Sequence, residues 1–243
     1  ERVLHNKGEG KVYLVGGESN ISKKVETQLK AKGLKIERIA GEDRFETSLE
    51  IAKKMSSTDE IFVAGGYAQA DAMSIAAVAA KGGAEETDAN PILLVPTTGL
   101  TKDQTKFVTN LTTKAYVVGG ETSVSADVEI ALEKMPTVSV KRISGVDRQE
   151  TNAKVVKEFY VKDSFDTVYV AKSDNNSLVD ALAVGVAAAS ETKAAPVLLA
   201  TDSLSSSQES VLKGIANGKL TAKKQAGYGI AAQVWETLNK IFK

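Results

Sequence analysis

The chain has 243 residues, of which 42% are hydrophobic and 26% are charged. These proportions are ordinary for a soluble globular protein, so the chain can bury a core. Lys and Arg number 31, as do Asp and Glu, and the formal net charge is zero. This balance disfavours nucleic acid as a main partner, because nucleic-acid-binding domains usually present a strongly basic face.

Several residue types needed for catalysis are scarce. The chain has no cysteine, which excludes disulfides, thiolate nucleophiles and cysteine zinc sites and is compatible with export as well as with the cytosol. The single histidine, His5, is expected to be solvated, and a histidine-based triad has no other histidine to use. No two aspartates stand at DxD spacing. We therefore expect no enzyme activity, no metal and no cofactor.

No segment is apolar for long enough to span a membrane. The longest apolar run, residues 181–189, has about half of the roughly 20 residues that a spanning helix needs. We therefore expect no membrane insertion. The chain opens with ERVLHN and shows no signal-peptide pattern, so we expect an internal or processed piece whose targeting segment has been removed.

Predicted strands and helices alternate along the chain. In order, we expect a strand at 11–15, a helix at 22–33, a strand at 34–39, a helix at 44–55, a strand at 60–64, a helix at 71–81, a strand at 91–95, a helix at 101–111, a strand at 114–118, a helix at 123–134, a strand from 138, a helix to 160, a strand at 167–171, a helix at 178–190, a strand at 196–200, and helices at 205–217 and 230–242. The alternation predicts right-handed βαβ units and mainly parallel α/β sheets. The continuous apolar run at 91–95 is typical of a central strand that is buried on both faces.

The chain contains a tandem repeat. RIAGEDRFET at 38–47 returns as RISGVDRQET at 142–151, a period of 104 residues. Three further motifs recur in the same order: YLVGGE at 13 and YVVGGE at 116, DAMS at 71 and DALA at 180, PILL at 91 and PVLL at 196. A fixed period of this size indicates duplicated whole domains. One strand and GlyGly turn are missing after residue 217, so either that turn has degenerated or residues are missing near Lys224.

Two of these motifs are candidate binding sites. The GlyGly pairs at Gly16 and Gly119 follow a strand and precede a helix, which is a natural seat for an anion, but they lack the full GxGxxG and we favour a plain tight turn.

In GEDR and GVDR, Asp43 and Asp147 are expected to be helix N-caps. Arg44 and Arg148 then either meet a phosphate or carboxylate, or form structural ion pairs between domains. Asp71 and Asp180 are expected to be first-turn partners of helix dipoles and not catalytic acids.

Together, RIxGxDRxET, VGGExxxS, the DAxS or DALA helix start and PILL resemble the cell-wall-binding repeat 2 (CWB2) family of clostridial surface proteins. The resemblance covers nearly the whole chain. Repeats of that family come in threes and are similar to Toprim-like Rossmann domains about a pseudo-threefold axis. The resemblance therefore implies tandem Rossmann-like, three-layer α/β/α repeats. By that phase, residues 1–37 are the C-terminal part of a first repeat, 38–141 are the second and 142–243 are the third.

The same resemblance implies non-covalent attachment to an anionic, phosphate-bearing cell-wall polysaccharide. Within the family, the chain is most similar to S-layer proteins. This implies a secreted structural protein of the cell wall or S-layer, with a low-molecular-weight S-layer subunit and neighbouring S-layer copies as partners.

The motif associated with polymer binding in the family falls here on Pro91, Ile92, Leu93 and Leu94, and in altered form on Pro196, Val197, Leu198 and Leu199. Buried leucines cannot hold a sugar phosphate, so we interpret the motif as a strand that positions a groove. The expected donors lie in the loops that follow, with charge from two arginines or from nearby lysines; the residues are Thr97, Thr98, Thr201, Ser203, Arg44 and Arg148.

Two alternatives remain open. In the first, the chain is the wall-anchoring module of another surface protein whose effector domain lies outside it. In the second, it is a Rossmann enzyme that processes nucleotides or phosphosugars at Gly16 or Gly119, against which the absence of paired acids argues.

Overall fold

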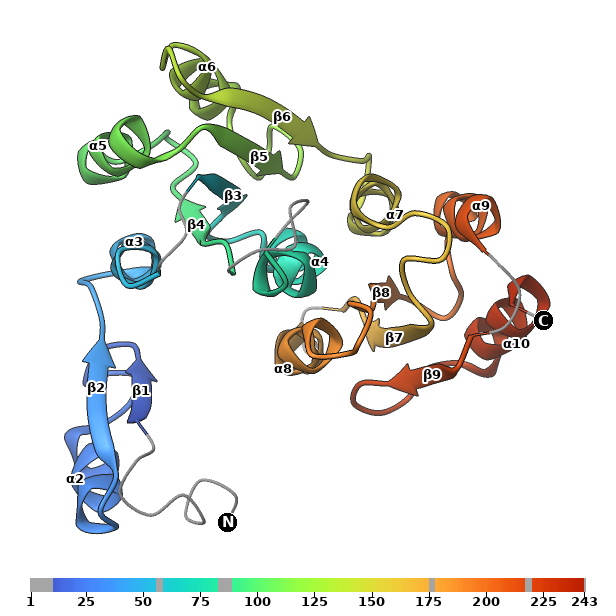
Figure 1. Ribbon diagram of the computed structural model, residues 1–243, viewed down its shortest axis with the longest axis horizontal. Coiled ribbons are helices and arrows are strands. Elements are labelled where there is room, and N and C mark those ends of the chain that lie inside the picture. The colour runs from blue at the N-terminus through green and yellow to red at the C-terminus, as the bar shows by residue number, and fades with distance from the viewer. Residues whose placement is uncertain (1–10, 56–58, 83–88, 175–177, 217–219, 243) are drawn as a thin grey trace. The chain divides into compact units, whose positions relative to one another are not determined.

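The computed structural model describes residues 11–55, 59–82, 89–174, 178–216 and 220–242 (Figure 1). His5 lies outside these residues. The chain divides into two compact units, residues 1–54 and 55–243. Strands and helices alternate in both units, and the strand pairs of the described residues are parallel. The predicted α/β class with parallel sheets is confirmed.

The first unit contains two strands and two helices. They are β1 (Lys11–Val15), α2 (Lys23–Ala31), β2 (Lys35–Ile39) and α3 (Arg44–Ala52). β1 and β2 pair in parallel, with Lys11 opposite Lys35. Since RIxGxDRxET starts at Arg38, the repeated motif begins on the last strand of one sheet and runs into the helix that follows it. The boundary between two sequence repeats therefore falls within a sheet and not between two sheets.

The second unit opens with a four-stranded sheet, which we call sheet B. Its strands are β3 (Glu60–Gly65), β4 (Ile92–Val95), β5 (Lys114–Val118) and β6 (Ser139–Ile143), and the crossover helices are α4 (Gln69–Ala80), α5 (Lys102–Leu111) and α6 (Ala126–Glu133). The strand order is β4-β3-β5-β6, so the direction of winding reverses between β3 and β5. With right-handed crossovers, α4 covers one face and α5 and α6 cover the other, which makes three layers.

A three-stranded sheet, which we call sheet C, completes the second unit. Its elements are α7 (Arg148–Phe159), β7 (Thr167–Lys172), α8 (Leu178–Ala189), β8 (Val197–Ala200), α9 (Ser206–Ile215), β9 (Ala222–Gln225) and α10 (Ala232–Ile241). The order is β8-β7-β9, so β9 pairs with β7 as β5 pairs with β3. A strand is thus present at Lys224. The first of the two alternatives fits: the GlyGly turn has degenerated while its strand has persisted.

The prediction that the strand at 91–95 is central is wrong. β4 and β8 both lie at the edge of their sheets, whereas the fully buried β3 is internal. β8 is nevertheless buried throughout, because its side chains belong to apolar clusters on both faces of the sheet, and Asn152 of α7 lies along its free edge. The Asn152 Nδ2 donates to the carbonyl of Val197 at 2.8 Å, and its Oδ1 accepts from the amide of Leu199 at 3.1 Å. A side chain on a helix therefore replaces a neighbouring strand.

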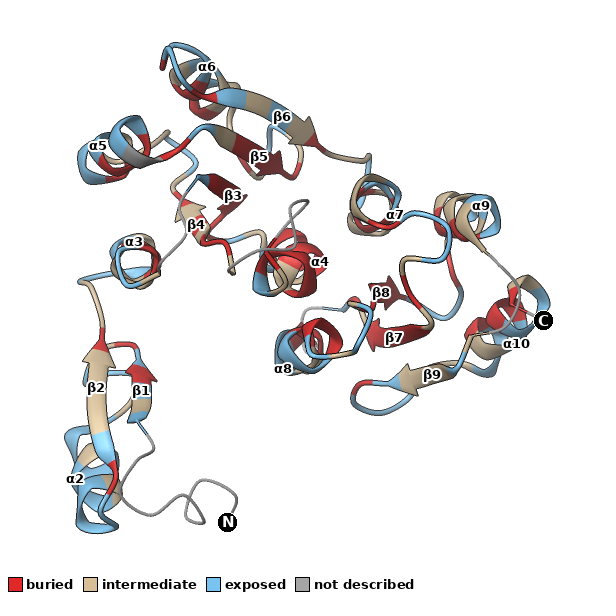
Figure 2. Ribbon diagram, in the orientation of Figure 1, coloured by how far each residue is buried: buried red, intermediate tan, exposed pale blue. Residues whose placement is uncertain are grey.

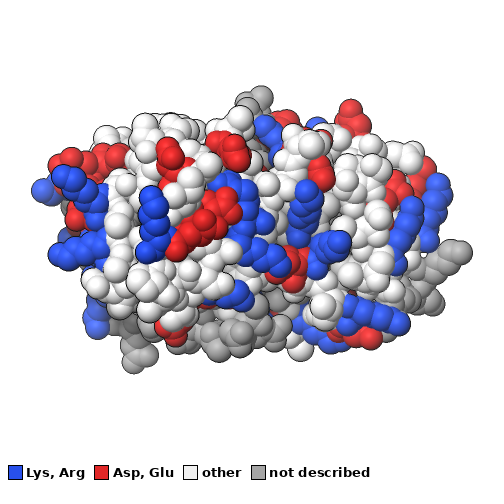
Figure 3. All heavy atoms as spheres, turned by 90° about the horizontal axis from the view of Figure 1, so that it is seen from above, with Lys and Arg blue, Asp and Glu red and all other residues white. Residues whose placement is uncertain are grey.

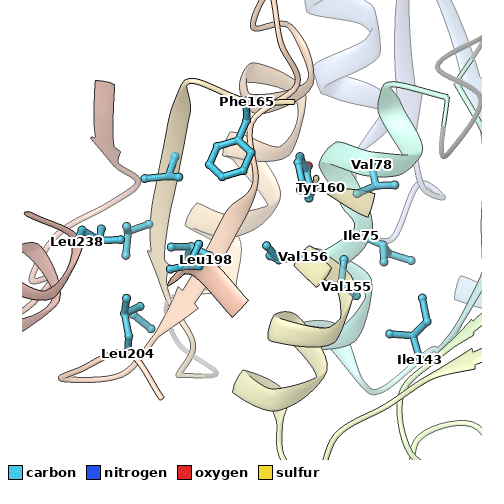
Figure 4. Close-up of a cluster of buried hydrophobic side chains, with 14 of the residues drawn as sticks. Ile75, Val78, Ile143, Val155, Val156, Tyr160, Phe165, Leu198, Leu204 and Leu238 are labelled. Atoms are coloured by element: carbon cyan, nitrogen blue, oxygen red, sulfur yellow. The ribbon is translucent and has the colours of Figure 1, made fainter. Parts of the chain in front are cut away.

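One apolar core joins sheets B and C. Figure 4 shows Val155 and Val156 of α7 between Ile143 of β6 on one side and Leu198 of β8 on the other. Burial is concentrated on β3, β5, β7, β8 and the inner faces of the helices, as the red segments of Figure 2 show. Because α7 contributes to both sides, the two sheets share a core and form one compact unit.

Helices α4 and α8 pack closely through small residues. A Cβ atom added at Gly185 would lie 2.9 Å from the Cβ of Ala76, which is inside normal contact distance. The outward face of α8 exposes a row of large apolar side chains, Val179, Leu182 and Val186. Among the described residues, no helix is both long and apolar enough to cross a membrane.

Candidate functional site

The first arginine of the repeated motif holds the GlyGly loop. The Nη1 of Arg142 donates to the carbonyl of Gly119 at 2.8 Å, and its Nε contacts Glu129 of α6 at 2.6 Å. In the first unit, the Nη1 of Arg38 likewise donates to the carbonyl of Gly16 at 2.7 Å and its guanidinium pairs with Glu26. These arginines therefore stabilise the loop and are not placed there to bind a ligand.

The rest of the motif builds the turn that precedes a helix. The carboxylate of Asp147 accepts from the amide of Glu150 at 2.8 Å, which confirms the predicted N-cap. The Thr151 hydroxyl accepts from the amide of Gly145 at 3.0 Å, and a Cβ at Gly145 would overlap Glu150. The first copy repeats these contacts with Gly41, Asp43, Glu46 and Thr47. Arg44 and Arg148 are the first residues of the helices that follow this turn.

The GlyGly pairs form tight turns, as predicted. Gly16 and Gly119 have φ of 119° and 114°, the left-handed region that glycine tolerates best. The helices that follow begin only at Lys23 and Ala126, so neither pair lies at a helix N-terminus. This geometry offers no support for an anion site at either pair.

A cavity of about 740 Å³ lies at the carboxyl edge of sheet B. It is lined by the segments that follow β3, β4 and β5 and by the start of α7. This is the point where the winding direction reverses, which is where open parallel sheets bind ligands. The cavity brings together the predicted residues Thr97 and Arg148, and it adds Tyr67, Asp71 and Ser123, which the sequence analysis had not assigned to a binding site.

Asp71 is more than a first-turn partner of a helix dipole. It is buried at the base of this cavity, and burial raises its pKa to about 6, although a hydrogen bond with Ser123 and the charge of Arg148 oppose the shift. Its Oδ2 lies 2.5 Å from the position that a Cβ on Gly119 would take. The equivalent Asp180 contacts Gly227 in the same way, so Gly227 replaces the lost GlyGly pair in the second copy. The DAxS-type and GlyGly motifs therefore form one unit.

A second cavity, of about 470 Å³, lies at the carboxyl edge of sheet C. It is lined by Lys172, Thr201 and Asp202, among others, and again by Arg148. The Nη1 of Arg148 donates to the carbonyl of Ser173, just after β7. This is a hydrogen bond to a backbone carbonyl and not the predicted ion pair between domains, and Arg148 also lines both cavities.

Residues of the PILL-type motifs are mostly inaccessible. Leu93, Leu198 and Leu199 are at most 1% exposed, Pro91, Pro196 and Val197 are buried, and Ile92 and Leu94 are half-buried. Thr98 and Ser203 are exposed beside the cavities but do not line them. Arg44 opens α3 of the first unit, in the position that Arg148 has in α7.

Two buried glutamines that the sequence analysis missed fix the loops after these strands. The Nε2 of Gln104 donates to the carbonyl of Leu94 at 2.7 Å, and the Nε2 of Gln208 donates to the carbonyl of Leu199 at 3.0 Å. Each also completes a capping box, with Thr101 and with Ser205. The pattern TxxQ and SxxQ at the repeat spacing was the available signal.

Acidic and basic side chains both line the two cavities. Asp71 and Asp147 line the first cavity with Arg148, and Asp174 and Asp202 line the second with Arg148 and Lys172. Acidic and basic side chains are also interspersed over the face shown in Figure 3. Within the described residues, no group of three His, Cys, Asp or Glu side chains is arranged to hold a metal ion.

The family model of cell wall binding domain 2 (CWB2) matches residues 38–129 and 142–227. The chain belongs to this family. Both CWB2 matches begin at the arginine that holds a GlyGly loop. The first covers β3 to β5 of sheet B, and the second covers β7 to β9 of sheet C.

Two curated relatives come from Bacillus subtilis (strain 168). The chain is 32% identical to N-acetylmuramoyl-L-alanine amidase LytC over 83% of its own length and 38% of that protein. It is 31% identical to the amidase enhancer over 88% of its own length and 27% of that protein. The chain thus spans well under half of each relative.

Two solved structures from Clostridium difficile share the CWB2 repeat fold. Cwp8 superposes with a TM-score of 0.85 at 39% identity, over 97% of this chain and 38% of that one. Cwp6 superposes with a TM-score of 0.82 at 29% identity, over 97% of this chain and 36% of that one. The chain is therefore a cell-wall-binding module of the kind found in these surface proteins.

Proposed function

We propose that this chain anchors a surface protein to the cell wall by binding an anionic wall polysaccharide non-covalently through its tandem repeats. The observation that carries the proposal is the pair of CWB2 matches in one chain, each of which covers a parallel sheet with a cavity at its carboxyl edge. Linked sites of weak individual affinity reach useful avidity on a repeating polymer. This favours a repeating ligand over a single small molecule.

In this proposal the exposed loops contact the polymer and the buried strands position them. Thr97 and Thr201 lie on the cavity walls, with Thr98 and Ser203 beside them, and offer hydroxyl groups. Arg148 supplies positive charge at both cavities, and Arg44 does so in the equivalent position of the first unit. The PILL-type strands act only through the loops that they support.

The finer identity that we propose is a secreted S-layer protein, most similar to the high-molecular-weight subunit. Its partners would be the low-molecular-weight subunit and neighbouring copies in the lattice, and it would have no catalytic role. The likeness to two Clostridium difficile Cwp structures supports a clostridial surface protein. Lattice formation with a low-molecular-weight subunit, seen by electron microscopy, is the expected result, and its absence would count against this identity.

The second candidate is the anchoring module of a surface protein with an effector domain outside this chain. The observation that favours it is the match to 38% of LytC, which is an N-acetylmuramoyl-L-alanine amidase. Peptidoglycan hydrolysis by the complete protein would support this candidate over the S-layer identity. Both candidates keep the same anchoring function for the chain itself.

We also propose that residues 1–37, 38–141 and 142–243 belong to three successive repeats, the first of them incomplete here. α4 and α8 are equivalent alanine-rich helices that pack together, and α8 still exposes Val179, Leu182 and Val186.

Sedimentation with purified cell walls tests the anchoring proposal. The chain should sediment with native Clostridium difficile walls and lose retention after acid stripping of anionic polymers. Rising salt should weaken binding, because phosphate contacts are ionic. An Arg44→Ala, Arg148→Ala double variant should bind less than a variant that removes exposed Lys102 and Lys106 of α5. Equal sedimentation with native and stripped walls would overturn the proposal.

A further inference from the structure

Tyr67 is an exposed aromatic ring on the wall of a cavity. It follows β3 directly after Gly65 and Gly66, lines the first cavity, and is 70% exposed. By contrast, Phe62 and Tyr116 on the adjacent strands are buried. A large apolar ring held in solvent beside a concave site is typical of a contact surface for a ligand.

The remaining wall of the cavity offers neutral polar groups. Gln69, Thr97, Thr122 and Ser123 contribute amide and hydroxyl groups, which both donate and accept hydrogen bonds. A sugar ring matches this combination, because its C–H face is apolar while its hydroxyls point outward around the rim. The ring of Tyr67 suits the apolar face, and the amide and hydroxyl groups suit the rim.

The charges at the base of the cavity disfavour a phosphate there. Asp71 is 7% exposed and faces the cavity from α4, and Asp147 adds a second carboxylate at the start of α7. Arg148 is the cation on the wall, and one of its N–H groups is already bonded to the carbonyl of Ser173. A carboxylate repels a phosphate but accepts hydrogen bonds from sugar hydroxyls.

We propose that the first cavity binds an uncharged sugar ring of the wall polysaccharide, stacked on Tyr67 and with a hydroxyl donated to Asp71. The linking phosphate then lies outside this cavity, on the side of the second cavity, where two cations (Arg148 and Lys172) match two carboxylates (Asp174 and Asp202) instead of one cation facing two carboxylates. This inference rests on the proposed polysaccharide anchor. It assigns neutral sugar recognition to one cavity and leaves phosphate recognition to the other.

The test uses the full chain and two probes. The first is the dephosphorylated oligosaccharide released by acid from Clostridium difficile wall polysaccharide, and the second is inorganic phosphate. Saturation-transfer NMR should show magnetisation passing to ring C–H protons of one sugar. The dissociation constant should rise about tenfold in Tyr67→Ala and change less than twofold in Tyr67→Phe, which keeps the ring.

Tyr228→Ala is the matched control, because Tyr228 is 93% exposed and lies outside the first cavity's lining. It should leave the oligosaccharide affinity within twofold. If the unaltered chain binds intact polymer, either of two results would overturn the inference. One is an unchanged oligosaccharide affinity in Tyr67→Ala, and the other is displacement of the oligosaccharide by inorganic phosphate. Loss of binding to intact polymer by the unaltered chain would instead overturn the anchoring proposal. Because Tyr67 is exposed, thermal denaturation of Tyr67→Ala should match that of the unaltered chain.

Discussion

Asp71 and Gly119 join two repeated motifs into a single structural unit. The carboxylate lies against the glycine, whose φ is 114°, so both space and backbone conformation require glycine at this position. Asp180 and Gly227 preserve the relationship in the second copy, although the flanking sequence has changed. The contact between the aspartate and the glycine is therefore present in both copies, although the sequence around the glycine differs.

Replacing Gly119 with alanine should therefore destabilise the second unit. The positive φ alone costs about 1 kcal/mol in a non-glycine residue, and the conflict with Asp71 adds to it. Gly120→Ala is the matched control, because an added Cβ there meets no atom within 4 Å. Urea denaturation should show a loss of more than about 1 kcal/mol for the first variant and little change for the second. Equal midpoints for both variants would contradict this reading.

Asp71 should also make stability depend on pH. Its pKa rises from an ordinary 3.8 to about 6 on burial, so the folded state binds this proton more tightly than the unfolded state does. Well below pH 3.8 the carboxyl is protonated in both states and its burial has no ionisation cost. Between pH 4 and 6 the unfolded state loses the proton first, so stability should fall relative to Asp71→Asn by at most about 1.4 kcal/mol per pH unit. The free energies of unfolding of the two proteins, measured by urea denaturation from pH 4 to 7, check this. If they change with pH in the same way, the pKa shift of Asp71 is absent.

Local chemistry made some residue roles predictable and hid others. The N-caps Asp43 and Asp147 were predicted because capping involves only the next three residues. The contact of Arg142 with the Gly119 carbonyl joins positions 23 residues apart, and no local pattern indicates it. Arg148 was left between two roles for the same reason, since its partner Ser173 lies 25 residues away.

At the scale of elements, the Asn152 side chain hydrogen-bonds the free edge of β8, where a neighbouring strand would otherwise pair. It is fully buried and hydrogen-bonded to Val197, Leu199 and Gln208. Asn152→Ala should cost about 2–4 kcal/mol, because it leaves buried backbone groups unpaired. Asn239→Ala, on the exposed surface of α10, removes the same side chain and should cost less than about 0.5 kcal/mol. Thermal denaturation of both variants checks the contrast, and similar losses would argue against the edge-covering role.

Two helix glycines give opposite predictions for one substitution. Gly185→Ala should destabilise the unit, because its new Cβ would lie 2.9 Å from Ala76 and push α4 and α8 apart. Gly214→Ala in α9 meets no atom within 4 Å and should stabilise by about 0.5–1 kcal/mol through helix propensity. Denaturation midpoints that shift in the same direction would show that the α4 and α8 contact has no such tight fit.

The sequence predicted most elements but not their order in the sheets. The period of the hydrophobic residues and the capping residues are local signals, so the alternation of strands and helices could be predicted. The edge positions of β4 and β8 could not be predicted, because an edge strand covered by a helix side chain has the same apolar run as a central strand. The covering residue, Asn152, is 45 residues from Val197.

For the whole molecule, duplication is the feature that connects sequence to function. The period of RIxGxDRxET was visible because each copy builds the same turn and holds the same loop. The cavities were not visible, because each is assembled from loops that follow different strands. Thr97 and Thr201 were nevertheless predicted as donors, since both lie in the loop that follows a repeated strand.

The most direct test of the anchoring account is the equilibrium affinity of the chain for purified wall polysaccharide that has been fractionated by length. Affinity per chain should rise about 10- to 100-fold between a single repeating unit and polymers long enough to occupy two linked sites. That result would establish both the ligand and the use of more than one repeat. A chain that binds none of the length fractions would contradict the account.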